Sequence, residues 1–220
     1  MNRYIYFFCV GILMSLGTKA QSSFIQQQLN FPRVADAFKL KEDLLRREFA
    51  EKGLNWPADE LYIRSFKYDG QLEVWVRSNH QKTFQLFKQY PVCKLSGVLG
   101  PKRREGDLQV PEGFYSIIEL NPLSQFHLSL GLNYPNSADK INGDQQRPGG
   151  DIYIHGKCAT VGCIPIQDDQ IEELYVLVAH AENKGQQNIP VHIFPVKLIW
   201  VTVWQNCNRS CRRIRVIFRW

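Results

Sequence analysis

Short apolar segments, divided by glycine and proline, occupy most of the chain between residues 61 and 196. Leu72–Val76 shows the pattern, because apolar and charged side chains alternate there as in a half-buried strand. The preceding Asp69–Gly70 pair is typical of a tight turn. Short strands with short connections favour a mainly β domain. The expected strands cover residues 61–63, 72–76, 84–87, 92–95, 114–120, 151–155, 161–166 and 191–196.

Two segments have helical spacing instead. Apolar residues between 34 and 49 recur with an approximately helical period, which predicts a helix over residues 34–52 that ends at Gly53. Asp169 and Glu172 have the spacing of a capping box, which predicts a second helix that ends at Gly185. The fold class is therefore mainly β with α. Between the strands, the stretch 121–150 is irregular apart from residues 127–132; it is long for a compact domain, and such loops are often functional.

The N-terminus has the composition of a secretory signal peptide. Arg3 precedes the apolar run Tyr4–Leu16, and Ala20 is a small residue suited to cleavage before Gln21. The run is short for a bilayer span, although an uncleaved anchor is the alternative. We therefore expect an exported protein of the periplasm or cell envelope, from which residues 1–20 are removed.

The net charge of +6 does not indicate a nucleic-acid partner. It comes from residues 197–220, which contain six basic residues and no acidic one. This tail combines an apolar stretch with an arginine-rich end. Two interpretations remain open: a truncated or frame-shifted reading, or a functional basic tail that contacts an acidic wall or membrane surface.

Five cysteines follow the expected signal peptide, so at least one thiol is unpaired within the chain. They are Cys93, Cys158, Cys163, Cys207 and Cys211. Cys158 has three open interpretations: a regulatory disulfide with Cys163, a zinc ligand beside His155, or a loop residue without a special role. Cys207 and Cys211 are close enough in sequence to pair if the backbone allows it.

The segment Asp151–Ile166 places a histidine and a cysteine on two neighbouring expected strands. A thiolate is the attacking form of cysteine, and an imidazolium beside it lowers the thiol pKa. Gly156 would leave room for substrate and for a backbone carbonyl that orients the His155 ring. Gly162 would let the backbone approach a reacting carbonyl, which makes the nearby amides candidate oxyanion donors for Cys163. The alternative is that His155 and Cys163 are ordinary core residues.

The sequence IHGKCATVGC resembles the active-site segment of the L,D-transpeptidase catalytic domain. The family pattern is His-Gly, then Ser or Thr, one residue and Gly-Cys, which matches His155, Gly156, Thr160, Gly162 and Cys163. The short gap resembles the branch of murein L,D-transpeptidases with compact active-site loops.

Three upstream segments extend the resemblance. Residues 100–107 and 110–115 resemble the loop that leads into the family's site and the Pro-x-Gly strand beneath it. Residues 132–136 resemble the loop that borders its cleft. The similarity covers about Leu61 to Val196, whereas the tail departs from the family.

The resemblance implies a β-sandwich or barrel with an N-terminal helix and a helix after the catalytic cysteine. Together with the residue patterns, the expected organisation is a signal peptide over 1–20, a helical segment over 21–60, a catalytic domain over 61–196 and an atypical tail over 197–220. The resemblance further implies Cys163 as nucleophile, His155 as base and then acid, and Thr160 as a residue that orients the loop or His155. Tyr134, Arg103 and Arg104, together with the neighbouring Lys102, are the candidate substrate-binding residues. The alternatives are a packed loop aromatic for Tyr134 and a solvated loop for the three basic residues. No metal or organic cofactor is implied, and a monomer is expected.

The implied activity is peptidoglycan cross-linking, with a role in cell-wall organisation and cell shape. Cys163 would attack a stem peptide at the L-centre carbonyl of its third residue, and the resulting thioester would pass to an amine. The first alternative has water as acceptor, in a carboxypeptidase or an endopeptidase that releases a wall-linked protein. The second is a non-catalytic wall-binding module.

Overall fold

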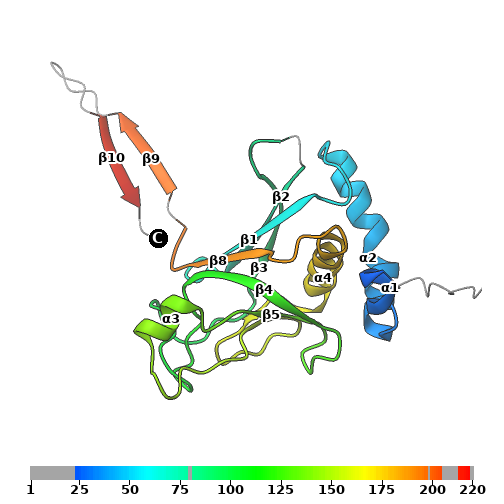
Figure 1. Ribbon diagram of the computed structural model, residues 1–220. Helices are drawn as coiled ribbons and strands as arrows, with labels where there is room; N and C mark the ends of the chain where they lie inside the picture. The colour runs from blue at the N-terminus through cyan, green and yellow to red at the C-terminus, as the bar shows by residue number, and fades with distance from the viewer. Residues whose placement is uncertain (1–22, 79–80, 198, 205–212, 219–220) are drawn as a thin grey trace, which may run out of the picture.

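The computed structural model describes residues 23–78, 81–197, 199–204 and 213–218 (Figure 1). The expected signal peptide and the pair Cys207 and Cys211 lie outside the described residues. The helices are α1 (Phe24–Gln28), α2 (Pro32–Glu51), α3 (Ser137–Asn142) and α4 (Asp168–Asn183). The strands are β1 (Glu60–Phe66), β2 (Gln71–Arg77), β3 (Gln85–Pro91), β4 (Gly113–Asn121), β5 (Ser129–Leu132), β6 (Tyr153–His155), β7 (Ile164–Pro165), β8 (Pro190–Phe194), β9 (Ile199–Trp204) and β10 (Arg213–Phe218).

Eight strands form one mixed sheet that curls into a half-barrel, in the order β3-β2-β1-β8-β4-β5-β6-β7. The pairs β1–β8 and β6–β7 are parallel, and the other neighbours are antiparallel. Strands β1 to β3 form one half of the sheet and β4 to β7 the other, and β8 joins them. This confirms the predicted class, mainly β with α.

Helix α4 fills the concave side of the molecule. It contacts β1, β5 and β6 on one side and α1 and α2 on the other, so it lies between the sheet and the N-terminal helices (Figure 1). Nine of its residues are buried, among them Tyr175, whose hydroxyl donates to Gln28 of α1 at 2.7 Å. The N-terminal helices therefore cover the core behind the strands that carry the site. Among the described residues, no helix has the length and apolar character needed to cross a membrane.

Several local predictions differ from the structure. Residues 92–95 do not form a strand, because β2 begins at Gln71, after the Gly70 turn, and its pairing with β3 already ends at Pro91. The predicted capping box does not form either: α4 starts at Asp168, and Asp169 is ion-paired with Lys41 of α2. Within the long loop, Asn136 and Asp139 cap α3, which the sequence reasoning missed. In the tail, β9 and β10 form a separate antiparallel pair.

Candidate active site

Strands β6 and β7 bring the predicted histidine and cysteine together. The two strands are parallel neighbours, with His155 paired in register with Pro165. His155 is the last residue of β6, and Cys163 comes directly before β7. The chain between them makes a tight loop, as the sequence predicted.

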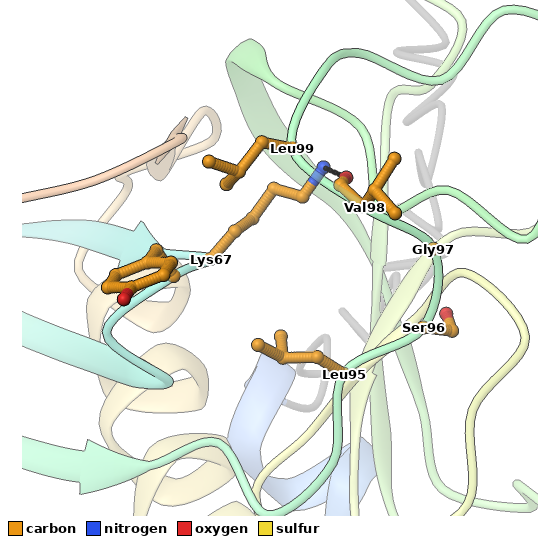
Figure 2. A pocket seen from close by; sticks show the side chains of 7 residues that line it. Lys67, Leu95, Ser96, Gly97, Val98 and Leu99 are labelled. Atoms are coloured by element: carbon orange, nitrogen blue, oxygen red, sulfur yellow. Dashed lines mark hydrogen bonds between the residues drawn. The ribbon is translucent and has the colours of Figure 1, made fainter. Parts of the chain in front are cut away.

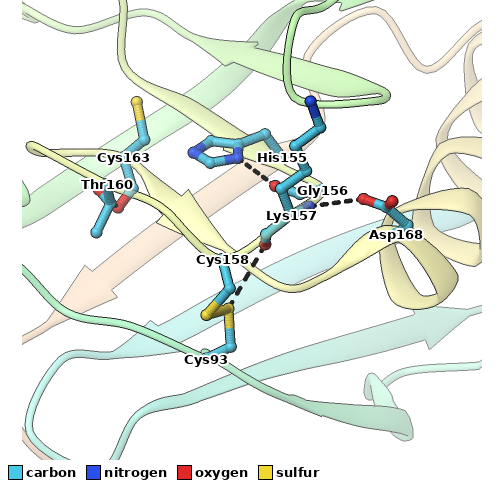
Figure 3. The surroundings of a disulfide bond; sticks show 8 residues. All are labelled: Cys93, His155, Gly156, Lys157, Cys158, Thr160, Cys163 and Asp168. Carbon is cyan, nitrogen blue, oxygen red and sulfur yellow. Dashed lines mark hydrogen bonds between the residues drawn. A yellow bond between two sulfur atoms is a disulfide. The ribbon is translucent and has the colours of Figure 1, made fainter.

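A backbone carbonyl fixes the orientation of the His155 ring. The side chain is 1% exposed, and its Nδ1 lies 2.6 Å from the Gly156 carbonyl oxygen. A carbonyl only accepts, so Nδ1 carries the proton and Nε2 of the neutral ring has a free lone pair. Figure 3 shows this second nitrogen on the side of the ring where Cys163 lies. The third member of the site is thus a main-chain carbonyl, which the sequence left as one option.

The Cys163 thiol forms hydrogen bonds with the backbone of β6 and of the residues before it. Its Sγ donates to the Asp151 carbonyl at 3.5 Å and accepts from the Tyr153 N–H at 3.4 Å. Asp151 has a φ of +55°, a left-handed conformation that aspartate tolerates. This turn aims its carbonyl at the sulfur, a contact that no sequence pattern indicated.

The resting pair is neutral. Burial raises the pKa of the Cys163 thiol, and the Tyr153 N–H only partly opposes this effect. Burial also lowers the pKa of His155, against the opposing effect of the hydrogen bond to Gly156. The expectation that an imidazolium lowers the thiol pKa is therefore wrong for the resting protein. Within the described residues, no hydrogen bond joins the imidazole to the thiol, so His155 suits the role of a base that acts when substrate arrives.

Thr160 shapes the loop in front of Cys163. Its hydroxyl donates to the Cys163 carbonyl at 2.7 Å and accepts from the Gly162 N–H at 3.0 Å. Gly162 has a φ of +146°, which a residue with a Cβ rarely adopts. The Gly162 amide is therefore occupied and does not serve as an oxyanion donor. The Cys163 N–H donates to no acceptor in the described part of the chain, and it remains the candidate donor.

Gly156 is needed for close packing. A Cβ at this position would lie 2.5 Å from a carboxylate oxygen of Asp168 and 2.7 Å from the Phe126 carbonyl oxygen. Protein atoms thus fill the space beside Gly156, so the expectation that this glycine leaves room for substrate is wrong.

Two cavities meet at the thiol. The larger, about 570 Å³, is lined by His155, Tyr153, Ser129 and the 121–126 loop. The smaller, about 250 Å³, is lined by residues 105–108 and 149–152 with Lys102 and Gly162. Asp151, Val161 and Cys163 line both. The two ends of the long loop 121–150 therefore border the site, whereas residues 132–136, which the resemblance assigned to the cleft border, line neither cavity.

Residues 71–193 match the family model described as YkuD, the L,D-transpeptidase catalytic domain. The chain belongs to this family. The match spans β2 to β8 and includes every residue of the site described above.

The chain is also similar to individual known proteins. The Escherichia coli K12 protein YafK, whose name assigns it provisionally to the L,D-transpeptidases, is 36% identical over 140 residues. The alignment covers 63% of this chain and 55% of YafK, so the chain spans about half the length of the curated relatives it matches. Two solved structures of the helical cell shape determining protein Pgp2 from Campylobacter jejuni are also similar. They have TM-scores of 0.49 and identities of 24% and 23%, and cover 64% and 70% of this chain and 49% and 56% of theirs.

The residues proposed to bind substrate in this L,D-transpeptidase domain have other contacts. Tyr134 is buried, and its hydroxyl donates to the Pro148 carbonyl at 3.0 Å, so it supports a loop and does not line either cavity. Arg103 and Arg104 are exposed and line neither cavity. The basic residue of this group that reaches a cavity wall is Lys102.

Asp107 organises the loop that carries these basic residues. One carboxylate oxygen pairs with Lys102 at 2.7 Å, and the other accepts from the backbone amides of Arg103 and Arg104. Although burial opposes it, the Lys102 ammonium and these amides lower the pKa of Asp107 to about 2. Lys102 is thus already paired, and its main contribution is to fix the wall of the smaller cavity.

Lys67 holds the 98–112 segment, which forms this wall of the smaller cavity. Figure 2 shows its side chain extending from the end of β1 to the Val98 carbonyl. The ammonium donates to the carbonyls of Val98, Gly100 and Val110 at 3.1, 2.7 and 2.9 Å, and pairs with Glu112 at 3.0 Å. One buried cation therefore joins both ends of the 98–112 segment.

Cys158 forms a disulfide with Cys93, which is none of the three alternatives considered for it. Its sulfur is consequently bonded and is not a thiolate ligand for zinc. Cys163 is the free cysteine in the described part of the chain. In Figure 3 its sulfur points away from the disulfide.

Proposed function

We propose that this domain is a cysteine acyltransferase that acts on peptidoglycan stem peptides. The observation that carries the proposal is the position of Cys163, a free thiol where two cavities meet, beside the unprotonated nitrogen of an oriented His155. Family membership supports the substrate class.

The proposed reaction begins with proton transfer. His155 Nε2 takes the Cys163 proton as the sulfur attacks the L-centre carbonyl of the third stem-peptide residue. The Cys163 N–H stabilises the oxyanion that forms next to it. The terminal D-amino acid then leaves with the proton from His155. An amine from a second stem peptide or a wall-linked protein takes the acyl group from the thioester.

The cavities suit a two-substrate reaction. Each of them opens onto the sulfur from a different wall, so the acyl donor and the acceptor amine can approach Cys163 from separate sides. The larger cavity also holds His155, which the acceptor must reach to lose its proton.

We also propose that the protein works outside the cytoplasm. The expected signal peptide motivates this location, and the Cys93–Cys158 disulfide supports it because disulfides persist in oxidising compartments. Cell fractionation after expression with and without residues 1–20 tests it. Equal retention of both forms in the cytoplasm would contradict export.

The activity is tested by incubating the purified protein with tetrapeptide muropeptides. Cross-linked dimers support transfer to an amine, whereas tripeptides alone indicate water as acceptor. Cys163→Ala is the control and is expected to lose all turnover. A carbapenem should add its mass to the wild type at Cys163 and not to this variant. Full activity of Cys163→Ala would overturn the assignment of the nucleophile.

A further inference from the structure

The Cys93–Cys158 disulfide lies inside the catalytic loop. Cys158 is exposed and stands five residues before Cys163, in the short connection between His155 and the nucleophile. Cys93 comes from a different part of the chain, two residues after the end of β3. Its backbone N–H donates to the Pro165 carbonyl at 3.0 Å, which places Cys93 beneath the β7 end of the loop.

The loop has other attachments besides this bond. At its start, the Lys157 N–H donates to Asp168 at 2.6 Å and the Lys157 ammonium donates to the Gln125 carbonyl at 2.6 Å. At its end, Thr160 holds Gly162 and Cys163. The nucleophile thus has supports other than the disulfide, and positioning need not be the main role of this bond.

A free thiol at Cys158 would threaten the reaction. It would be exposed, on the same short loop as a sulfur that must become a thiolate in each catalytic cycle. Two thiols this close in sequence form a disulfide readily when an oxidant is present and the backbone permits. Such a bond would consume the nucleophile.

We propose that Cys93 serves to occupy Cys158 and thereby keeps Cys163 free in an oxidising environment. This inference rests on the proposed role of Cys163. Without Cys93, the Cys158 thiolate attacks a low-molecular-weight disulfide and releases one thiol. Cys163 then attacks the Cys158 sulfur and releases the second thiol. The protein loses two electrons and two protons, and the small disulfide is reduced to two thiols.

Three variants test the proposal: Cys93→Ser, Cys158→Ser and the double variant. All of them lack the disulfide, so loss of stability is matched, and only Cys93→Ser retains a thiol at Cys158. Each is exposed to oxidised glutathione, and iodoacetamide labelling of Cys163 is then measured by mass spectrometry. Cys158 and Cys163 lie on one tryptic peptide, residues 158–184. In Cys93→Ser this peptide should become two hydrogens lighter and take up no label.

The expected pattern is specific. After oxidation, Cys93→Ser should lose about tenfold or more of its labelling at Cys163, and dithiothreitol should restore it. Cys158→Ser and the double variant should keep their labelling. Cys93→Ala provides a second replacement if the serine variant does not fold. Equal labelling in all three variants, or pairing of Cys158 with Cys207 or Cys211, would overturn the proposal.

These readouts do not depend on turnover. If the labelling pattern appears but muropeptides are not processed, the protective role of Cys93 stands and the proposed enzymatic function fails. If muropeptides are processed and all variants label equally, the enzymatic function stands and this inference fails.

Discussion

At the scale of single residues, backbone hydrogen bonds and burial determine the protonation of His155 and Cys163. The Gly156 carbonyl keeps a proton on His155 Nδ1, and burial keeps the other nitrogen unprotonated. Burial also keeps the proton on Cys163. Before substrate binds, the acid (the Cys163 thiol) and the base (the His155 imidazole) are therefore both uncharged. Such a pair exchanges its proton during attack on substrate and not before it.

The neutral pair predicts the pH dependence of alkylation. A raised thiol pKa means that the rate of Cys163 labelling by iodoacetamide should still increase above the ordinary thiol pKa of about 8.5. A lowered His155 pKa means that imidazolium forms only below its ordinary value of about 6.5. His155→Gln should leave the labelling profile nearly unchanged, because no ion pair is lost. A rate plateau at neutral pH in the wild type would contradict a neutral pair.

Gly156 provides a second prediction at this scale. The Gly156→Ala methyl would meet the Phe126 carbonyl, which belongs to the backbone and cannot easily move. We expect the free energy of unfolding to fall by about 2 kcal/mol, as in overpacked cores. Urea unfolding measures it. Gly150→Ala is the control, because a methyl there meets no atom within 4 Å. Equal stability of the two variants would contradict the packing argument.

At the scale of elements, the walls of the site are held by buried charges. Lys67 should be the most sensitive, because its ammonium joins both ends of the 98–112 segment. Lys67→Met leaves Glu112 and three carbonyls without this partner, and should lower the free energy of unfolding by about 3 kcal/mol. The rate at which iodoacetamide labels Cys163 should also change in this variant, because the 98–112 segment forms a wall of the smaller cavity.

Exposed Lys94 is the comparison residue for this experiment. Lys94→Met should change stability by less than about 0.5 kcal/mol. Hydrogen exchange then locates the effect: the amides of 98–112 should lose protection in Lys67→Met alone. Uniform loss across the sheet would instead indicate a general effect of removing a charge.

The part of the site contained in one short segment could be predicted from the sequence. His155, Thr160 and Cys163 lie within nine residues, so their spacing on two short strands limits how far apart they can be. The contacts from distant segments could not be predicted. The pairing of Cys93 with Cys158 spans 65 residues, and the Asp151 carbonyl reaches the thiol only because of a left-handed turn. The resemblance places Tyr134 at the cleft, but its side chain is buried and its hydroxyl donates to the Pro148 carbonyl.

The fold was predictable to a similar extent. Alternating strands and the apolar period of α2 are local signals, and the structure confirms them. The missed helix α3 is short and depends on the side chains that cap it. The start of α4 was misplaced because Asp169 pairs with Lys41, a residue 128 positions away.

At the scale of the whole molecule, the disulfide links the two halves of the sheet. It closes a loop with a sequence separation of 65 residues, for which chain entropy predicts an upper value of about 4 kcal/mol of stabilisation. Reduction with dithiothreitol should lower the free energy of unfolding of the wild type by about 3 kcal/mol in urea titrations. The Cys93→Ser/Cys158→Ser variant should be less stable from the start and insensitive to dithiothreitol. A response of this variant would assign the effect to other cysteines.

The strand that follows the nucleophile also affects how copies of the molecule behave towards one another. β7 is the last strand of the sheet, has two residues, and one of them is Pro165, which has no amide hydrogen. The Pro165 carbonyl is already taken by the Cys93 N–H. A strand from a neighbouring chain could therefore form almost no backbone hydrogen bonds with β7. The sheet edge beside Cys163 thus resists edge-to-edge aggregation.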